Sequence, residues 1–214
     1  MTGPIVQQAR VRTNKSKDST HTVEIRAITF TELWENYVTG DPFKPDPADK
    51  ADYSNQCALR LSATFHRLGI EMKSFSQKTV RPMPGAKVLG RVLMNGRPAA
   101  TRAYELGEWL KVQPFAGLPR KPEDVTGKDW ESRVKGRTGI IMFHGYWLRS
   151  GEDAGNASGG HIDLWNGERM PISSATSLFS VLGRRFGYQD MAADLSFGYS
   201  DLRNSKLILF WEIK

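Results

Sequence analysis

Cysteine is almost absent from this sequence, because its 214 residues include only one, Cys57. A single cysteine cannot form an intramolecular disulfide, so nothing in the covalent chemistry indicates maturation in an oxidising compartment, and we expect synthesis in a cytoplasm. Long apolar runs are missing too, since no segment approaches the roughly 18 apolar residues that a membrane span requires. Residues 1–10 contain no apolar stretch of the kind found in secretory signal peptides. We therefore expect neither a transmembrane helix nor a Sec signal.

Two classes of binding motif are absent as well. The sequence has no Cys/His pairs at the spacing of zinc sites and no cluster of aromatic residues of the kind that reads RNA. Its formal net charge of +7 favours an anionic partner. Much of the excess lies in residues 10–17 and 111–137, and the second stretch is also rich in glycine, proline and acidic residues. We expect a solvated surface of mixed sign and no nucleic-acid partner.

What remains is the composition of an ordinary globular protein. Hydrophobic residues make up 39% of the chain, which is enough for the core of one domain at this length. Residues 1 to about 22 are polar and basic with little periodicity. We expect a basic N-terminal extension over residues 1–28, irregular in structure, and a single domain over residues 29–214.

The hydrophobic periodicity predicts helices early in the chain. Thr29 or Thr31 can cap a short helix over residues 32–38. Apolar residues recur at helical spacing over residues 56–68, where Gly69 is placed to end the helix. A further helix is expected over residues 101–110.

Buried strands are expected late in the chain, at residues 139–144, 161–165 and 206–213. Residues 71–99, by contrast, are expected to form a long and partly ordered connection across the surface. Early helices and late strands favour an α+β fold in which N-terminal helices pack on a C-terminal antiparallel sheet.

Cys57 lies where a polar loop gives way to helical periodicity, which makes it a candidate nucleophile. A thiol in the first turn of a helix faces the positive end of the macrodipole and unpaired backbone N–H groups, which favour the thiolate. The alternative is a small buried residue without reactivity. In that case the protein would be a non-catalytic basic binding module.

His161 is the candidate base for such a thiolate. Strand alternation places His161, Asp163 and Trp165 on one face, where a histidine could meet the sulfur and an acid could hold the imidazole. Backbone N–H groups near Cys57, and the Gln56 side chain, are candidate donors for an oxyanion. His144 is the competing base. His66, nine residues after Cys57 on the same helix, points to the opposite side and is expected on the surface.

Four segments stand out together: residues 55–62 (NQCALRLS), 139–143 (GIIMF), 160–167 (GHIDLWNG) and the closing pair Phe210-Trp211. Over roughly residues 30–214 the chain resembles the amidase effectors of type VI secretion, specifically their fourth family. The resemblance implies a papain-like fold of the NlpC/P60 type. It also implies Cys57 as nucleophile and His161 as general base, with no metal or organic cofactor.

The third catalytic residue is open. In the family an aspartate follows the histidine by about eleven positions, whereas residues 170–174 here read MPISS and contain no carboxylate. Asp163, two residues after His161 on the same strand, is the nearest acid and our candidate for the orienting role. Ser173, Ser174 or a backbone carbonyl are the alternatives.

The resemblance also implies a substrate and partners. Such effectors cut peptidoglycan stem peptides between D-glutamate and meso-diaminopimelate, so we expect this bond to be the target. Synthesis in the cytoplasm without a signal peptide, secretion by type VI machinery and action in the periplasm of target bacteria would follow. A cognate immunity protein that plugs the cleft is expected as a partner. A papain-like hydrolase acting on a protein or acyl amide is the enzymatic alternative.

Overall fold

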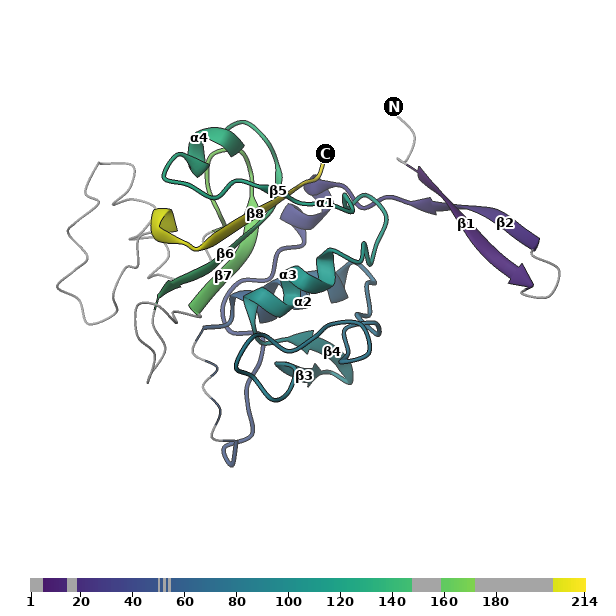
Figure 1. Cartoon of the computed structure of the whole chain (residues 1–214). Helices are drawn as coiled ribbons and strands as arrows, with labels where there is room; N and C mark the ends of the chain where they lie inside the picture. Colours follow the sequence, from purple (N-terminus) through teal and green to yellow (C-terminus); the bar gives the residue numbers. More distant parts are fainter. Residues whose placement is uncertain are drawn as a thin grey trace.

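The chain begins with a β-hairpin that precedes the main body. The computed structural model describes residues 6–14, 19–49, 51, 53, 55–147, 159–171 and 202–214. Strands β1 (Val6–Asn14) and β2 (Ser19–Arg26) pair antiparallel, and Figure 1 shows them reaching away from the remaining elements. The described residues of this segment are therefore regular in structure, and the expectation of an irregular structure was wrong.

Helix α1 (Phe30–Glu35) follows the hairpin and begins with a capping box. The Glu32 N–H donates to the Thr29 hydroxyl at 3.3 Å, and the Thr29 N–H donates to the Glu32 carboxylate at 3.0 Å. This reciprocal pair satisfies two backbone donors that a helix start leaves open. The helix ends earlier than expected, with Asn36 as its C-cap, and the Asn36 backbone and side chain both donate to the Glu32 carbonyl.

Helix α2 (Cys57–Arg67) is the buried helix that the periodicity predicts. Ala58, Leu61 and Phe65 lie in the main core on one side, while Leu59 packs against Met94 and Ala99 on another. The chain leaves the helix at Gly69, whose φ of +80° falls in the left-handed region that favours glycine. Helix α3 (Ala103–Leu110) also matches its predicted range.

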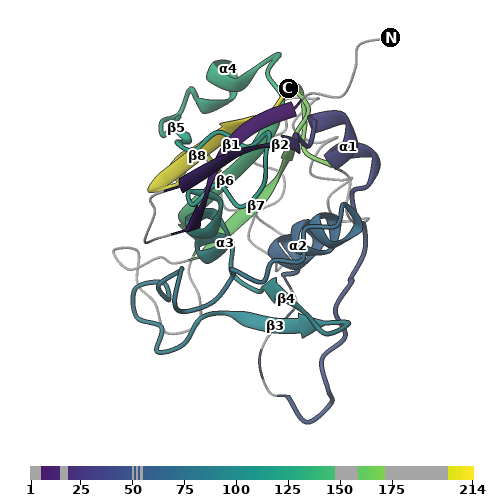
Figure 2. The same cartoon turned by 90° about the vertical axis from the view of Figure 1, so that its right-hand side faces the viewer.

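A small hairpin lies within the segment expected to be an irregular connection. Strands β3 (Arg91–Met94) and β4 (Arg97–Ala100) pair antiparallel around Asn95-Gly96, and both turn residues have positive φ. Figures 1 and 2 show this hairpin on the opposite side of α2 from the central sheet.

The preceding loop, residues 71–90, is held to α3 by a buried acid. Glu105 is fully buried and accepts from the backbone N–H groups of Met83 at 2.9 Å and Gly90 at 2.6 Å. The Arg102 guanidinium completes this clamp at 2.9 Å. A buried carboxylate with three donors is well compensated for its loss of water.

The central sheet has the order β5-β8-β6-β7, and all its neighbouring strands are antiparallel. Its strands are β5 (Glu123–Asp124), β6 (Gly139–Trp147), β7 (Gly159–Trp165) and β8 (Leu207–Glu212). A short 3-10 helix, η1 (Leu202–Asn204), precedes β8. The expected α+β class with an antiparallel sheet is confirmed.

Strand alternation sends apolar side chains to both faces of this sheet. Met142, Ile162 and Trp211 belong to the core shared with α1, α2 and α3. Phe143 and Phe210 instead pack with helix α4 (Trp130–Val134) on the other face. Figures 1 and 2 show the sheet between α4 and the α2–α3 layer.

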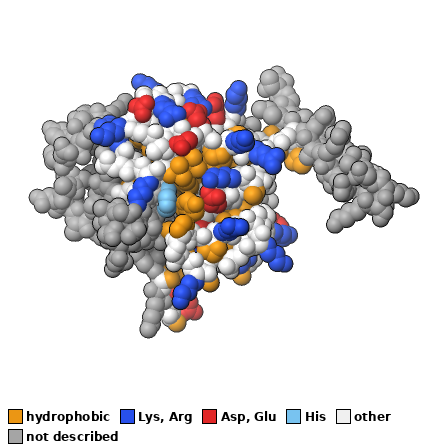
Figure 3. All heavy atoms as spheres, viewed as in Figure 1, with side chains coloured by type: hydrophobic (Ala, Val, Ile, Leu, Met, Phe, Trp, Pro, Cys, Tyr) orange, Lys and Arg blue, Asp and Glu red, His pale blue; other side chains and the backbone are white. Residues whose placement is uncertain are grey.

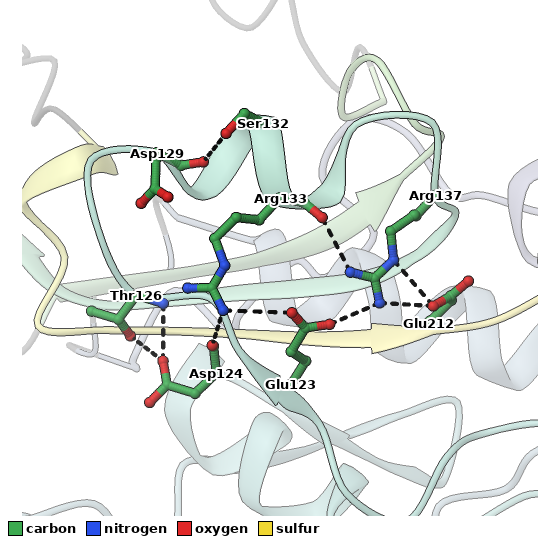
Figure 4. Close-up of polar contacts among 8 residues, drawn as sticks. All are labelled: Glu123, Asp124, Thr126, Asp129, Ser132, Arg133, Arg137 and Glu212. Atoms are coloured by element: carbon green, nitrogen blue, oxygen red, sulfur yellow. Dashed lines mark hydrogen bonds and ion pairs between the residues drawn. The ribbon is translucent and has the colours of Figure 1, made fainter.

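An ion-pair network holds α4 and β5 to the central strand β8, as Figure 4 shows. Arg137 lies 2.8 Å from the Glu123 carboxylate and 2.7 Å from that of Glu212. Arg133 approaches Glu123 at 3.5 Å. The Arg137 guanidinium also lies 5.0 Å from the centre of the Phe210 ring, in cation–π geometry.

Candidate active site

Cys57 is the first residue of α2, and its side chain is only 3% exposed. The start of α2 packs against β7, the edge strand of the central sheet. In this position the Cys57 sulfur accepts a hydrogen bond from the Ile162 backbone N–H and is hydrogen-bonded to the His161 imidazole. The structure therefore brings together the two residues that the sequence paired over about a hundred positions.

Asp163 is brought to the same place by β7. Its carboxylate is 2% exposed, and Oδ2 lies 3.4 Å from His161 Nε2. Its other oxygen, Oδ1, accepts from the Leu164 backbone N–H at 2.9 Å. The His161 side chain is 22% exposed, whereas Cys57 is buried.

The electrostatics of the pair favour its charged form. Burial alone would raise the pKa of the Cys57 thiol, but the adjacent His161 charge and hydrogen bond, with the Ile162 N–H, hold it below its ordinary value. Burial would lower the pKa of His161, but the Cys57 thiolate and the Asp163 carboxylate raise it above its ordinary value. A thiolate facing an imidazolium is the reactive state of a nucleophilic cysteine.

Gln56 has a structural contact rather than a free amide. Its side chain accepts from the Phe43 backbone N–H at 3.0 Å and donates to the Phe43 carbonyl at 2.7 Å. Arg60, one turn into α2, donates to the Gly40 carbonyl at 2.6 Å. These two side chains fix the loop of residues 40–43 beside the start of α2.

Two residues near the site were missed by sequence reasoning. Tyr37 and Arg60 both lie close enough to act electrostatically on one another, and Tyr37 also faces Asp163 and Cys57. No local pattern indicates this, because the course of the chain after α1 decides where Tyr37 lies. Ser173 and Ser174, the alternative orienting residues, lie outside the described residues.

The other histidines have different surroundings. His144, the competing base, lies on β6 with its ring centre 4.6 Å from that of Tyr104, whereas His161 is the histidine bonded to the Cys57 sulfur. His66 is only 6% exposed, and its Nε2 lies 2.9 Å from the Pro98 carbonyl of β4.

Two features of the described part of the chain concern metal binding and membrane insertion. Within residues 6–147, 159–171 and 202–214, apart from the gaps given above, no group of three or more His, Cys, Asp and Glu side chains is placed to hold a metal ion. The helices described there are all too short or too polar to cross a membrane.

Comparisons with known proteins agree with the motifs. Residues 53–211 match the family model of Tae4, "Type VI secretion system (T6SS), amidase effector protein 4". No curated protein was found to be similar. Among solved structures, the type VI effector Tae4 from Enterobacter cloacae is 16% identical, with a TM-score of 0.48 over 87% of this chain and 96% of that one. The family match, which includes both Cys57 and His161, shows that the chain belongs to the Tae4 amidase effectors of type VI secretion, enzymes that act on peptidoglycan.

Proposed function

We propose that this effector cleaves the γ-D-glutamyl–meso-diaminopimelate bond of peptidoglycan stem peptides, with Cys57 as nucleophile, His161 as acid and base, and Asp163 as the residue that orients His161. The observation that carries the proposal is the contact of a buried helix-terminal thiol with an imidazole that itself lies 3.4 Å from a buried carboxylate. The assignment of the bond rests on the family resemblance.

In the first step the Cys57 thiolate attacks the carbonyl carbon of the γ-glutamyl bond. A carbon–sulfur bond forms, and the carbonyl oxygen becomes an oxyanion. The amine of diaminopimelate then leaves with its electron pair and takes the proton of the His161 imidazolium. His161 is suited to this transfer because its raised pKa keeps the proton in place until the amine needs it.

Backbone N–H groups at the start of α2 are the candidate donors for the oxyanion. The Cys57 N–H donates to Asn55 Oδ1 at 3.3 Å, a long contact that a charged oxygen would readily replace. The N–H groups of the first helical turn point the same way and have no carbonyl partner within the helix. Gln56 is the weaker candidate because its amide is bonded to Phe43.

In the second step water hydrolyses the thioester. His161, now neutral, takes a proton from the water, hydroxide adds to the acyl carbon, and the carbon–sulfur bond breaks. The D-glutamyl carboxylic acid is released, and the thiolate–imidazolium pair is restored.

The remaining expectations concern architecture and biology. We propose that residues 29–214 form one papain-like domain of the NlpC/P60 type and that residues 1–28 are a basic extension of it. The family places the protein in secretion and in action on the wall of a target cell. We further propose action in the periplasm and a cognate immunity protein that covers the cleft.

The test uses Gram-negative peptidoglycan incubated with the wild type or with Cys57→Ala. Mass spectrometry of the soluble products should show diaminopimelate-containing peptides, and muropeptides that end at D-glutamate, only with the wild type. Cleavage at another bond would reject the substrate assignment while retaining the enzyme. If the wild type cleaves no peptidoglycan but hydrolyses a protein or acyl amide, the alternative hydrolase reading is favoured. No amide hydrolysis of any kind would favour a binding module with an inert Cys57.

A further inference from the structure

The hydroxyl of Tyr37 lies in the protein interior, where a polar group needs a hydrogen-bond partner. Its ring packs against the core cluster that contains Cys57. Its hydroxyl oxygen is buried and has no hydrogen bond of good geometry to any residue that the structure describes, although the Asp163 carboxyl lies within reach as an acceptor. A buried hydroxyl without a partner costs free energy, so native proteins rarely retain one without a use.

The position of Tyr37 is fixed by contacts on either side. Its backbone N–H donates to the Trp34 carbonyl at the end of α1, and the next N–H, from Val38, donates to the Thr64 hydroxyl of α2 at 3.0 Å. Thr64 itself donates to the Arg60 carbonyl at 2.9 Å. These bonds hold the segment after α1 against the helix that carries Cys57.

Three charged or titratable groups face the Tyr37 hydroxyl: the Asp163 carboxyl from β7, and Arg60 and Cys57 from α2. Arg60 has no acceptor atom to offer. The Cys57 sulfur already takes part in hydrogen bonds with His161 and with the Ile162 N–H. Asp163 has acceptor capacity to spare, because a carboxylate can accept about four hydrogen bonds and Oδ1 takes one from Leu164.

Tyr37 is also a donor at any working pH. Burial and the nearby Asp163 charge raise the pKa of the Tyr37 phenol above its ordinary value, although Arg60 opposes this. The phenol therefore keeps its proton. It can therefore act as a hydrogen-bond donor to Asp163.

We propose that Tyr37 is a positioning residue of the catalytic centre, whose hydroxyl donates to Asp163 and holds its carboxylate turned toward His161 Nε2. The proposal rests on the proposed function, because it assigns Tyr37 a role through Asp163 and His161. In this role Tyr37 acts through Asp163 and not on the scissile bond.

Removal of the Tyr37 hydroxyl should make the Cys57 thiolate less stable. Without the phenol donor, the Asp163 carboxylate is no longer held toward His161 Nε2, so it stabilises the His161 imidazolium less. A weaker imidazolium in turn stabilises the Cys57 thiolate less. Tyr37→Phe should therefore shift the midpoint of Cys57 alkylation by iodoacetamide to higher pH, by about half to one unit. The kcat on a muropeptide substrate should fall about tenfold, with little change in KM.

Tyr53→Phe is the matched control. Tyr53 also donates to an aspartate, Asp49, at 2.9 Å, but in an exposed loop. Its loss should leave the alkylation midpoint and kcat unchanged. If Tyr37→Phe has the wild-type alkylation midpoint and the wild-type kcat, the proposal is overturned. The hydroxyl would then contribute neither to the stability of the thiolate nor to turnover.

A double variant and a histidine variant separate the possible failures. If Tyr37 acts through Asp163, the effects of Tyr37→Phe and Asp163→Asn on kcat should not add in the double variant; full additivity would contradict the proposal. Alkylation of His161→Ala tests the proposed function separately. If alkylation of Cys57 slows in His161→Ala but is unchanged in Tyr37→Phe, only the role of Tyr37 is rejected. If alkylation of Cys57 is as fast in His161→Ala as in the wild type, the catalytic pair itself is rejected.

Discussion

Each member of the Cys57–His161 pair stabilises the charged form of the other. The thiolate raises the pKa of His161, and the imidazolium lowers the pKa of Cys57, in both cases against the effect of burial. The ion pair therefore persists between the lowered Cys57 pKa and the raised His161 pKa. Activity should show a plateau through neutral pH, falling at lower pH as the thiolate protonates and at higher pH as the imidazolium loses its proton.

Replacing His161 tests how much of the reactivity of the Cys57 thiol depends on the His161 imidazolium. In His161→Ala the cation and its hydrogen bond are lost while the burial of the sulfur remains, so the pKa of Cys57 should rise. Iodoacetamide should then alkylate Cys57 at neutral pH at least about tenfold more slowly. The rate can be followed by intact-protein mass spectrometry.

His66→Gln is the control for this experiment. His66 contacts Pro98 of the β3–β4 hairpin, so the substitution should leave the alkylation rate at its wild-type value. Equal alkylation of His161→Ala and the wild type would contradict the ion pair.

Asp163→Asn tests the orienting carboxylate with little change in shape. The amide oxygen can still accept from the Leu164 N–H, but the negative charge next to His161 Nε2 is lost. The His161 pKa should fall, so the alkaline side of the pH–rate profile should move to lower pH. The plateau kcat should fall by about 10- to 100-fold. A profile and rate identical to the wild type would assign the orienting role to another group.

At the scale of elements, helices and strands with a regular hydrophobic pattern were predicted correctly, whereas strands whose pattern is interrupted by proline or charged residues were missed. The helices around Cys57 and Trp109 and three strands of the central sheet, β6, β7 and β8, fall where their spacing predicts, because each buries one or two continuous apolar faces. The β3–β4 hairpin was missed because Pro98 and two arginines weaken its strand pattern. Its Asn95-Gly96 turn was a usable signal, since this dipeptide favours the positive φ values of a two-residue hairpin turn.

The missed hairpin also explains the error at His66. An offset of nine residues correctly indicates that His66 points away from Cys57, and a surface position was expected for it. The hairpin instead covers that side of α2 and supplies the Pro98 carbonyl. The site itself was predictable where it depends on periodicity, as with His161 and Asp163 on β7. Tyr37 was not, because its place depends on a loop held by contacts distant in sequence.

The Glu105 clamp is an element-scale feature with a measurable effect on stability. In Glu105→Gln one carboxylate oxygen becomes an NH2 group, so either the Met83 or the Gly90 N–H faces a donor. The free energy of unfolding should fall by about 2–3 kcal/mol, as measured by urea denaturation.

Glu108→Gln on the same helix is the comparison. Glu108 is partly exposed and pairs with Lys111 at 2.5 Å, so its loss should cost less than about 1 kcal/mol. Equal losses for the two variants would show that Glu105 does not hold the loop.

At the scale of the whole molecule, the surface seen in Figure 3 mixes charges of both signs around exposed apolar side chains. The net charge is nevertheless +7. Such an excess attracts a polyanion at long range without defining a docking site, and salt screens it over about 10 Å at 0.1 M.

Association with the anionic wall should therefore depend on salt. Inactive Cys57→Ala should pellet with peptidoglycan sacculi several-fold less well at about 200 mM than at about 20 mM sodium chloride. Wild-type kcat on a small soluble muropeptide should change less than about twofold, because the reacting groups are buried. Pelleting that does not respond to salt would exclude an electrostatic contribution.

The strand order also has a consequence for biosynthesis. β8 lies between β5 and β6, although it follows all the other strands that the structure describes. A ribosome therefore makes Cys57, His161 and Asp163 before it makes the strand that covers the inner edge of β6. Until β8 is translated, the β6–β7 pair that carries His161 lacks its central neighbour and the apolar side chains of Phe210 and Trp211. Catalytic competence should thus arise late in synthesis, as a single event set by the arrival of β8.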